Sequence, residues 1–240
     1  MIGTLLNVAA VLVGGSLGML FGARLPENLK KTVIAGLGLF TAVTGVKMFL
    51  ETQNSLIVLG SLLVGALLGE WWKIEDGLQT LGGWLEKRFN RNQAEGPGDA
   101  ADSRFVRGFL TASLVFCIGP MTILGSLQDG LKGDYSLLAI KAVLDGFASL
   151  AFASTLGVGV LFSVIVILIY QGSISLLAAQ LSTIVTPAMM AEMTAAGGVL
   201  LLGIAISSLL EIKKIRVGNF LPALVIAPLI VAILAFFGIK

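Results

Sequence analysis

Histidine is absent from this 240-residue sequence, and cysteine occurs once, as Cys117. The missing histidine removes the commonest general base and metal ligand. A single cysteine excludes a disulfide framework and a cluster of thiolate ligands. Charged residues make up only 12% of the chain, about half the share found in a typical soluble domain. So few charges cannot cover a water-facing surface, and we therefore expect most of the surface to face lipid.

Two further absences narrow the expected function. The formal net charge is only +2, which gives little electrostatic basis for a nucleic-acid partner. The sequence also has no Gly-x-x-x-x-Gly-Lys loop for a nucleotide and no visible nucleophile–base pair. We therefore expect no enzyme activity, no cofactor, no bound metal and no nucleic-acid partner.

Long apolar runs are what the chain has in abundance. Hydrophobic residues make up 56% of the sequence and glycine occurs 30 times, as is typical of packed transmembrane helices. Because about 20 apolar residues in a helix cross a bilayer, the runs predict about eight spans. They lie near residues 2–22, 32–50, 55–72, 107–127, 137–156, 158–181, 194–212 and 217–238. The fifth and sixth spans meet at Gly157-Val158-Gly159 and are alternatively one bent segment.

The composition changes abruptly after the third span. Apolar residues recur at helical spacing among charged ones from Ile74 to Phe89, which predicts an amphipathic helix on the membrane surface. Residues 90–103 have no apolar periodicity and predict a flexible linker. Trp71, Trp72 and Trp84 lie near the expected boundary, where tryptophan is enriched at membrane interfaces.

The distribution of lysine and arginine predicts the orientation. If the N-terminus is outside, the inside segments 23–31, 73–107 and 213–216 hold twelve of the 16 basic residues. The outside then keeps only Lys47, Lys132, Lys141 and Lys240. Basic residues are enriched in cytoplasmic loops, so we expect both termini outside a bacterial inner membrane.

Internal similarity predicts a more specific plan. Residues 3–13 align with residues 159–169, Gly15-Ser16 then aligns with Gly172-Ser173, and Ala35-Gly36 matches Ala196-Gly197. The alternative is a chance match between helices rich in glycine, leucine and valine. Because the first and sixth spans are five crossings apart, the two copies would be inverted, a plan that recurs in secondary transporters with the site near the midplane.

The expected organisation follows from this repeat. The segments are repeat A with spans 1–3 (residues 1–72), the amphipathic helix and linker (73–103), the central spans 4 and 5 (104–157) and repeat B with spans 6–8 (158–240).

The fourth span contains a predicted helix break followed by a polar stripe. Pro120 lacks an N–H group and its ring clashes with the preceding turn, so Gly119-Pro120 should kink or break the helix. A carbonyl freed at membrane depth needs protein or a cavity to satisfy it. Small or polar residues then share one helix face at Thr122, Gly125, Ser126 and Asp129. We expect this stripe to face a substrate or ion; the alternative is a packing kink whose hydroxyls bond their own backbone.

The fifth span carries charge on one face, at Lys141, Asp145 and Ser149. Asp145 lies about eight residues into the span, about 12 Å deep at 1.5 Å per residue. An ionised carboxylate there costs at least about 2.5–3.5 kcal/mol, and Lys141 one turn away is its obvious partner. We expect Asp145 to handle an ion, a proton or a solute. The alternative is a buried ion pair that only orients the helix.

Several other polar positions have either two possible interpretations or a purely structural one. Asn7 and Ser163 occupy matching places in the repeat and either face a shared cavity or, for Asn7, form an interhelical hydrogen bond. Glu70 and Glu192 lie near predicted span ends and are expected to be solvated. Asn219 is expected to begin the last span.

Small residues recur every four positions on two spans. The sets are Gly14, Gly18 and Gly22, and Ser61, Gly65 and Gly69. Such faces allow helix backbones to approach closely. We interpret them as close helix contacts within the chain or as the seam of a homodimer.

Five stretches of the sequence resemble the bacterial YdfK/YqgA-like family of membrane proteins. They are residues 2–18, Arg24-Leu-Pro-Glu27, residues 116–125, Lys141 with Leu144-Asp145, and Leu221-Pro-Ala-Leu224. They occur in order over nearly the whole chain. The resemblance implies an inner-membrane protein and, because the family has no assigned activity, leaves the substrate open.

The sequence thus predicts an all-α polytopic bundle with an inverted repeat around a central broken-helix pair. The expected function is secondary transport of a small solute or ion, driven by an ion or proton gradient. An ion channel lined by the same polar helices is the alternative.

Overall fold

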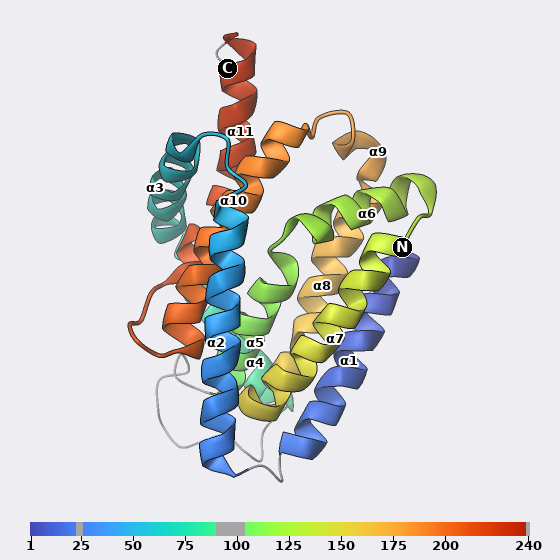
Figure 1. The fold of residues 1–240 in the computed structure, drawn as a ribbon, viewed down its shortest axis with the longest axis vertical. Helices are drawn as coiled ribbons and strands as arrows, with labels where there is room; N and C mark the ends of the chain where they lie inside the picture. Colours follow the sequence, from blue (N-terminus) through green and yellow to red (C-terminus); the bar gives the residue numbers. More distant parts are fainter. Residues whose placement is uncertain (23–25, 90–103, 239–240) are drawn as a thin grey trace. The chain divides into compact units, whose positions relative to one another are not determined.

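The computed structural model describes residues 1–22, 26–89 and 104–238, and this part of the chain is helical without strands (Figure 1). The helices are α1 (Ile2–Gly22), α2 (Glu27–Phe49), α3 (Ser55–Trp71), α4 (Ile74–Phe89), α5 (Arg104–Cys117), α6 (Pro120–Lys132), α7 (Ser136–Leu156), α8 (Gly159–Leu176), α9 (Ala178–Leu181), α10 (Pro187–Ile204) and α11 (Ala223–Phe236). A π-helical turn, η2 (Ala205–Leu209), extends α10, and a 3-10 turn, η3 (Val217–Phe220), precedes α11. The expected all-α class is confirmed.

Six helices within the described ranges are long and apolar enough to cross a membrane. They are α1, α2, α7, α8, α10 with η2, and α11 with η3. Two bent pairs, α3 with α4 (56°) and α5 with α6 (62°), raise the number to eight if each pair is one span. The fifth and sixth predicted spans are separate helices, since α7 ends at Leu156 and the following Gly157 has a φ of 82°, which does not continue a helix.

The chain forms two compact units. Unit 1 comprises residues 1–37 and 78–183, and unit 2 comprises residues 38–77 and 184–240. Unit 1 therefore contains α1 and α5–α9, whereas unit 2 contains α3, α10 and α11. Helices α2 and α4 contribute to both. The four predicted segments are consecutive stretches of the sequence, whereas the two units are defined by contacts in space. The predicted division into four segments therefore stays a prediction.

The glycine face of α1 packs directly on the backbone of α7 in unit 1. A Cβ atom would overlap a backbone carbonyl of α7 at each of three positions: Gly14 against Gly146, Gly18 against Leu150, and Gly22 against Ser154. The paired numbers rise together, so the two helices run parallel with their backbones in contact. In unit 2, Gly65 and Gly69 lie against Ala223 and Asn219 in the same way. Both glycine faces are filled within the chain, and a homodimer, which stays a prediction, would need other surfaces.

Three pairs of helices pack antiparallel inside these units. The contacts are Asn7–Gln171 and Gly15–Leu161 for α1 and α8, Gly38–Leu210 and Gly45–Leu202 for α2 and the α10–η2 segment, and Gly65–Ala223 and Gly69–Asn219 for α3 and the η3–α11 segment. In each pair one residue number rises as the other falls. In a chain that crosses the membrane eight times, the two helices of each of these pairs would likewise run in opposite directions.

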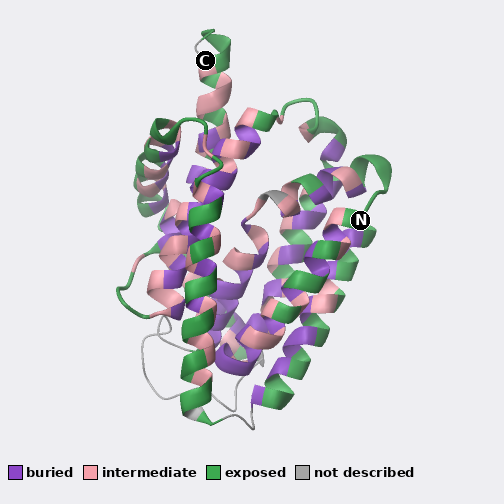
Figure 2. Ribbon diagram, viewed as in Figure 1, coloured by how far each residue is buried: buried purple, intermediate pink, exposed green. Residues whose placement is uncertain are grey.

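The outer surfaces of the helices are strongly apolar. Phe40, Leu67 and Phe147 are 72%, 73% and 71% exposed, and Figure 2 shows exposed positions alternating with buried ones around α1 and α7. Apolar surface on this scale is not stable in water and is suited to lipid. Trp71 and Trp72 at the end of α3 are also exposed, as interfacial tryptophans would be.

Helix α4 matches the predicted amphipathic segment, and one side of it packs on α5. Leu85 is buried against Phe105, Val106 and Phe109. This contact anchors α4 to unit 1 through its apolar face. The predicted linker, residues 90–103, lies outside the described residues.

Candidate functional site

The break between α5 and α6 occurs at the predicted Gly119-Pro120 step. Gly119 has φ 149° and ψ 151°, a region that is essentially restricted to glycine. Pro120 is the first residue of α6. In a continuous helix the Phe116 carbonyl would accept a hydrogen bond from the N–H of residue 120, and proline has none. The break therefore leaves the Phe116 carbonyl without its helical partner.

Two side chains from other parts of unit 1 satisfy this carbonyl. Lys141 Nζ on α7 donates a hydrogen bond to the Phe116 oxygen over 2.7 Å. The Thr122 hydroxyl on α6 donates to the same oxygen over 3.3 Å. Because Thr122 and Lys141 share one acceptor, the polar stripe of the fourth span and the charged face of the fifth span meet at the break.

Lys141 also forms a buried ion pair with Asp145. Their side chains are only 8% and 12% exposed. Asn7 Nδ2 on α1 donates to the same Asp145 oxygen over 2.9 Å and lies 3.4 Å from Gln171 Oε1 on α8. The interhelical hydrogen bond expected as one alternative for Asn7 is therefore present.

We call this cluster the polar core. It consists of Asn7, the Phe116 carbonyl, Thr122, Lys141, Asp145 and Gln171. Helices α1, α5, α6, α7 and α8 each contribute to it. A carboxylate, an ammonium group and two amides thus converge in the interior of unit 1.

Asp129, at the far end of the stripe, binds the start of α1. Its Oδ2 accepts a hydrogen bond from the Gly3 N–H over 3.1 Å and lies 3.0 Å from the α-amino group of Met1. The first N–H groups of a helix have no partner within the helix, so Asp129 caps α1 from another element. The stripe therefore runs from the polar core to the beginning of α1.

Two of the remaining predicted residues contribute to helix packing, and the third has no partner among the described residues that explains its position. The Ser149 hydroxyl donates to the Val11 carbonyl over 2.8 Å and so ties α7 to α1. Gly125 lies against Leu138, where an added Cβ would come within 2.8 Å of the side chain. Ser126 is fully buried, and its hydroxyl has no hydrogen-bond partner in the described part of the chain.

Sequence reasoning missed Gln171. Gln171 is completely buried in α8, and a carboxamide within a hydrophobic span was the signal that could have identified it. The Ser163 hydroxyl donates to the Val160 carbonyl of its own helix over 2.7 Å. A cavity shared by Ser163 and Asn7 stays a prediction.

Glu192 is not solvated, contrary to expectation. It is 2% exposed and accepts hydrogen bonds from the Thr52 hydroxyl (2.6 Å) and from the N–H groups of Gln53 (2.8 Å) and Asn54 (3.0 Å). These bonds hold the turn between α2 and α3. The burial of Glu192 is therefore explained by its hydrogen bonds to this turn.

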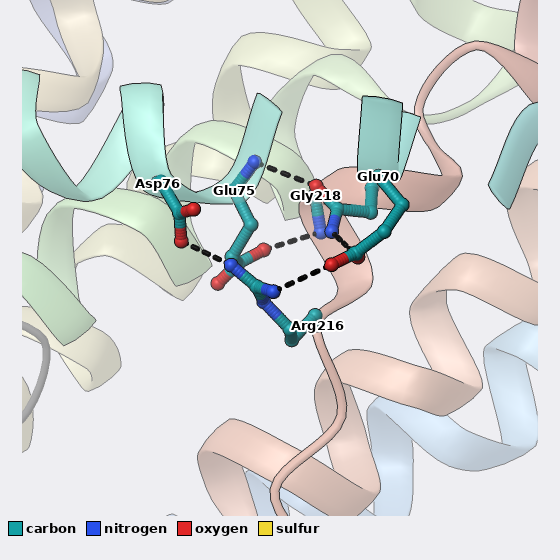
Figure 3. A network of polar contacts seen from close by, with 6 residues as sticks. Glu70, Glu75, Asp76, Arg216 and Gly218 are labelled. Carbon is teal, nitrogen blue, oxygen red and sulfur yellow. Dashed lines mark hydrogen bonds and ion pairs between the residues drawn. The ribbon is translucent and has the colours of Figure 1, made fainter. Parts of the chain in front are cut away.

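A second polar network joins α3, α4 and the segment before α11 in unit 2 (Figure 3). Its bonds are Arg216–Glu70 (2.9 Å), Arg216–Asp76, Gly218 N–H to Glu75 (2.6 Å), Glu75 N–H to Asn219 (2.8 Å) and Asn219 to Glu70. The pKa of Arg216 is raised, mainly because its guanidinium group donates a hydrogen bond to Asp76. Asn219 lies at the start of the last span, as expected, and its side chain also binds α3 and α4. This network clamps three segments together, and its exposed ion pairs contribute little energy individually.

Unit 2 also contains an apolar cavity of about 220 Å³. Its lining includes Leu62, Val199, Ile206 and Phe220, and every lining residue is apolar or glycine. A cavity without polar groups offers nothing to orient a solute or ion. The candidate site is therefore the polar core of unit 1.

Fold and site together define an all-helical membrane protein with a buried charged cluster beside a broken helix. The family model described as "Protein of unknown function (DUF554)" matches residues 2–232, and the chain belongs to this family. It is 34% identical over 238 residues to the uncharacterized protein YqgA of Escherichia coli, covering 99% of both chains. It is 30% identical over 244 residues to the uncharacterized membrane protein YdfK of Bacillus subtilis, covering 100% of both. The resemblance inferred from the sequence is confirmed, and no solved structure matches the chain.

Proposed function

We propose that the protein is a secondary transporter that moves a small solute or ion across the bacterial inner membrane, with the polar core as its site. The observation that carries the proposal is the buried Lys141–Asp145 pair, bonded to Asn7 and to the freed Phe116 carbonyl. A buried ion pair is on average no more stabilising than apolar residues of the same volume. Ionisable groups within transmembrane helices accordingly mark ion or substrate pathways.

The antiparallel helix pairs support an inverted repeat. Under the proposed alignment α1 corresponds to α8, α2 to α10, and α3 to α11. Each helix packs against its own counterpart in the opposite direction, as a two-fold axis in the membrane plane would require. Asn7 and Gln171 lie where α1 meets α8, so the polar core is at a meeting point of the two proposed copies.

Flux through purified protein tests the proposal. Proteoliposomes with an imposed proton or sodium gradient would be supplied with labelled amino acids, carboxylates, ammonium or alkali cations. We expect gradient-dependent, saturable uptake of one class, which Asp145→Asn abolishes. Asp134→Asn is the matched control, because it makes the same chemical change at a carboxylate outside the predicted spans. Hydrogen bonds from Ser136 lower the pKa of Asp134.

The other outcomes separate the alternatives. Unitary currents in planar bilayers, with flux that does not saturate, would establish the channel instead. Absence of both saturable uptake and currents would leave the buried pair with a purely structural role and overturn the proposal.

The orientation is tested by reporter fusions. With both termini outside and residues 73–106 inside, fusions after residues 95 and 240 should report opposite sides of the membrane. A fusion after Asp134, in the turn between α6 and α7, should report the same side as residue 240. If residues 95 and 240 lie on the same side, the eight-span topology is wrong.

A further inference from the structure

Five buried polar atoms beside the polar core have no hydrogen-bond partner among the described residues. They are Thr4 Oγ1, Asn7 Oδ1, Ser126 Oγ, Gln171 Nε2 and Ser175 Oγ. The residues that carry them are no more than 5% exposed. Buried polar groups are nearly always hydrogen-bonded, because a lost partner leaves the desolvation cost uncompensated. These atoms are therefore suited to a partner that the described part of the chain does not provide.

Other buried hydroxyls in the same protein find partners in their own helices. Ser61 donates to the Val58 carbonyl, Ser163 to that of Val160, and Thr155 to that of Ala151. Any serine or threonine in a helix can donate such a hydrogen bond to a carbonyl of the preceding turn. Ser126 and Ser175 do not form it. Thr111 and Ser113 on α5 also lack such a bond, but α1, α6 and α8 bring unpartnered atoms together with the residues that contact the polar core.

Contacts along α1, α6 and α8 indicate how the residues that carry these atoms lie relative to one another. At one level Gly3 bonds Asp129, and Gly130 lies against the Ser175 carbonyl. One helical turn further along α1, about 6 Å at 1.5 Å per residue, Asn7 reaches Asp145 and Gln171.

The unpartnered side chains lie on the facing turns between these levels. Thr4 precedes Asn7 by three positions on α1, Ser126 precedes Asp129 by three on α6, and Gln171 and Ser175 are four apart on α8. Such spacings put each pair on one helix face. The five side chains therefore lie on helices α1, α6 and α8, which pack against one another.

We propose that these five atoms border a common space that binds one monovalent alkali cation. Four of the five atoms are oxygens, the ligand type that hard cations prefer. Asp129 lies three positions after Ser126 on α6, and Asp145 accepts a hydrogen bond from Asn7. Each carboxylate already has an ammonium partner, so little net negative charge remains, which disfavours a divalent ion. The Gln171 N–H donates to a water that completes the coordination shell.

The cation is the coupling or transported ion only if the proposed transport function is correct. Its binding is independent of transport and is measured separately. Lys141 and Asp145 lie at one side of the space, so a cation there and the Lys141 ammonium are neighbours. This arrangement links ion occupancy to the geometry of the polar core.

Thermal unfolding of the purified full-length protein in detergent tests binding. Sodium, potassium or lithium chloride is titrated against choline chloride at constant ionic strength. We expect at least one alkali ion to raise the melting temperature saturably, by about 3–5 °C when its concentration is tenfold above the dissociation constant. Thr4→Val and Ser126→Ala should abolish this rise. Both should melt at or above the wild-type temperature in choline, since each removes an unpaired buried hydroxyl.

Ser163→Ala is the matched control. It deletes a buried hydroxyl that is bonded within its own helix, and it should keep the ion-dependent rise. No rise with any alkali ion in the wild type, or a rise retained in both test variants, overturns the site. Transport without ion-dependent stabilisation would overturn the cation site alone, whereas ion-dependent stabilisation without transport would overturn only the transporter.

Discussion

Asp145→Asn should abolish transport and lower the free energy of unfolding by about 3–5 kcal/mol, the usual result of removing one partner from a buried ion pair. The substitution leaves the Lys141 ammonium buried, with the Phe116 carbonyl as its remaining acceptor. Asparagine cannot neutralise that charge. Urea or thermal unfolding in detergent measures the loss of stability, and uptake into proteoliposomes measures the loss of transport.

The double variant Lys141→Met/Asp145→Leu separates stability from function. Replacing both members of a buried pair by apolar residues is often neutral or stabilising. The Phe116 carbonyl and the Asn7 amide each lose a partner in this variant, so we expect a loss of stability that is smaller than that of Asp145→Asn. Transport should remain absent, because the polar core has lost its charges. Asp134→Asn should change neither property. Full transport by the double variant would show that the pair only orients α7.

Gly18→Ala should lower the free energy of unfolding by about 1–3 kcal/mol or more, or prevent folding. The new Cβ would overlap the Leu150 carbonyl, and the parallel backbones of α1 and α7 would have to separate. Overpacking of a close contact has costs of this size. Thermal unfolding and resistance to proteolysis in detergent are the measurements.

Gly36→Ala is the matched control for this effect. It makes the same chemical change in α2, where an added Cβ meets nothing within 4 Å. Alanine is also favoured over glycine inside a helix by roughly 0.5–1 kcal/mol, so this variant should be at least as stable as the wild type. Equal stability of Gly18→Ala and wild type would contradict the close packing of α1 on α7.

The sequence by itself determined the features that depend on neighbours along the chain. Apolar runs predicted the membrane-spanning helices because helix length is matched to bilayer thickness. The break at Gly119-Pro120 follows from the covalent structure of proline, which cannot donate to the Phe116 carbonyl. Lys141 and Asp145 could be paired in advance because residues four apart share a helix face.

Only the tertiary structure decided which distant groups complete these local features. Asn7 and Asp145 are 138 positions apart, and their contact depends on how α1 packs against α7. Ser149 and Gly125 share helix faces with charged residues, yet packing assigned them to the Val11 carbonyl and to Leu138. Glu192 lies near a helix end, where sequence predicts solvent, but the turn between α2 and α3 covers it. Periodicity fixes the face of a helix on which a residue lies, whereas the partner on that face is chosen by close packing between helices distant in sequence.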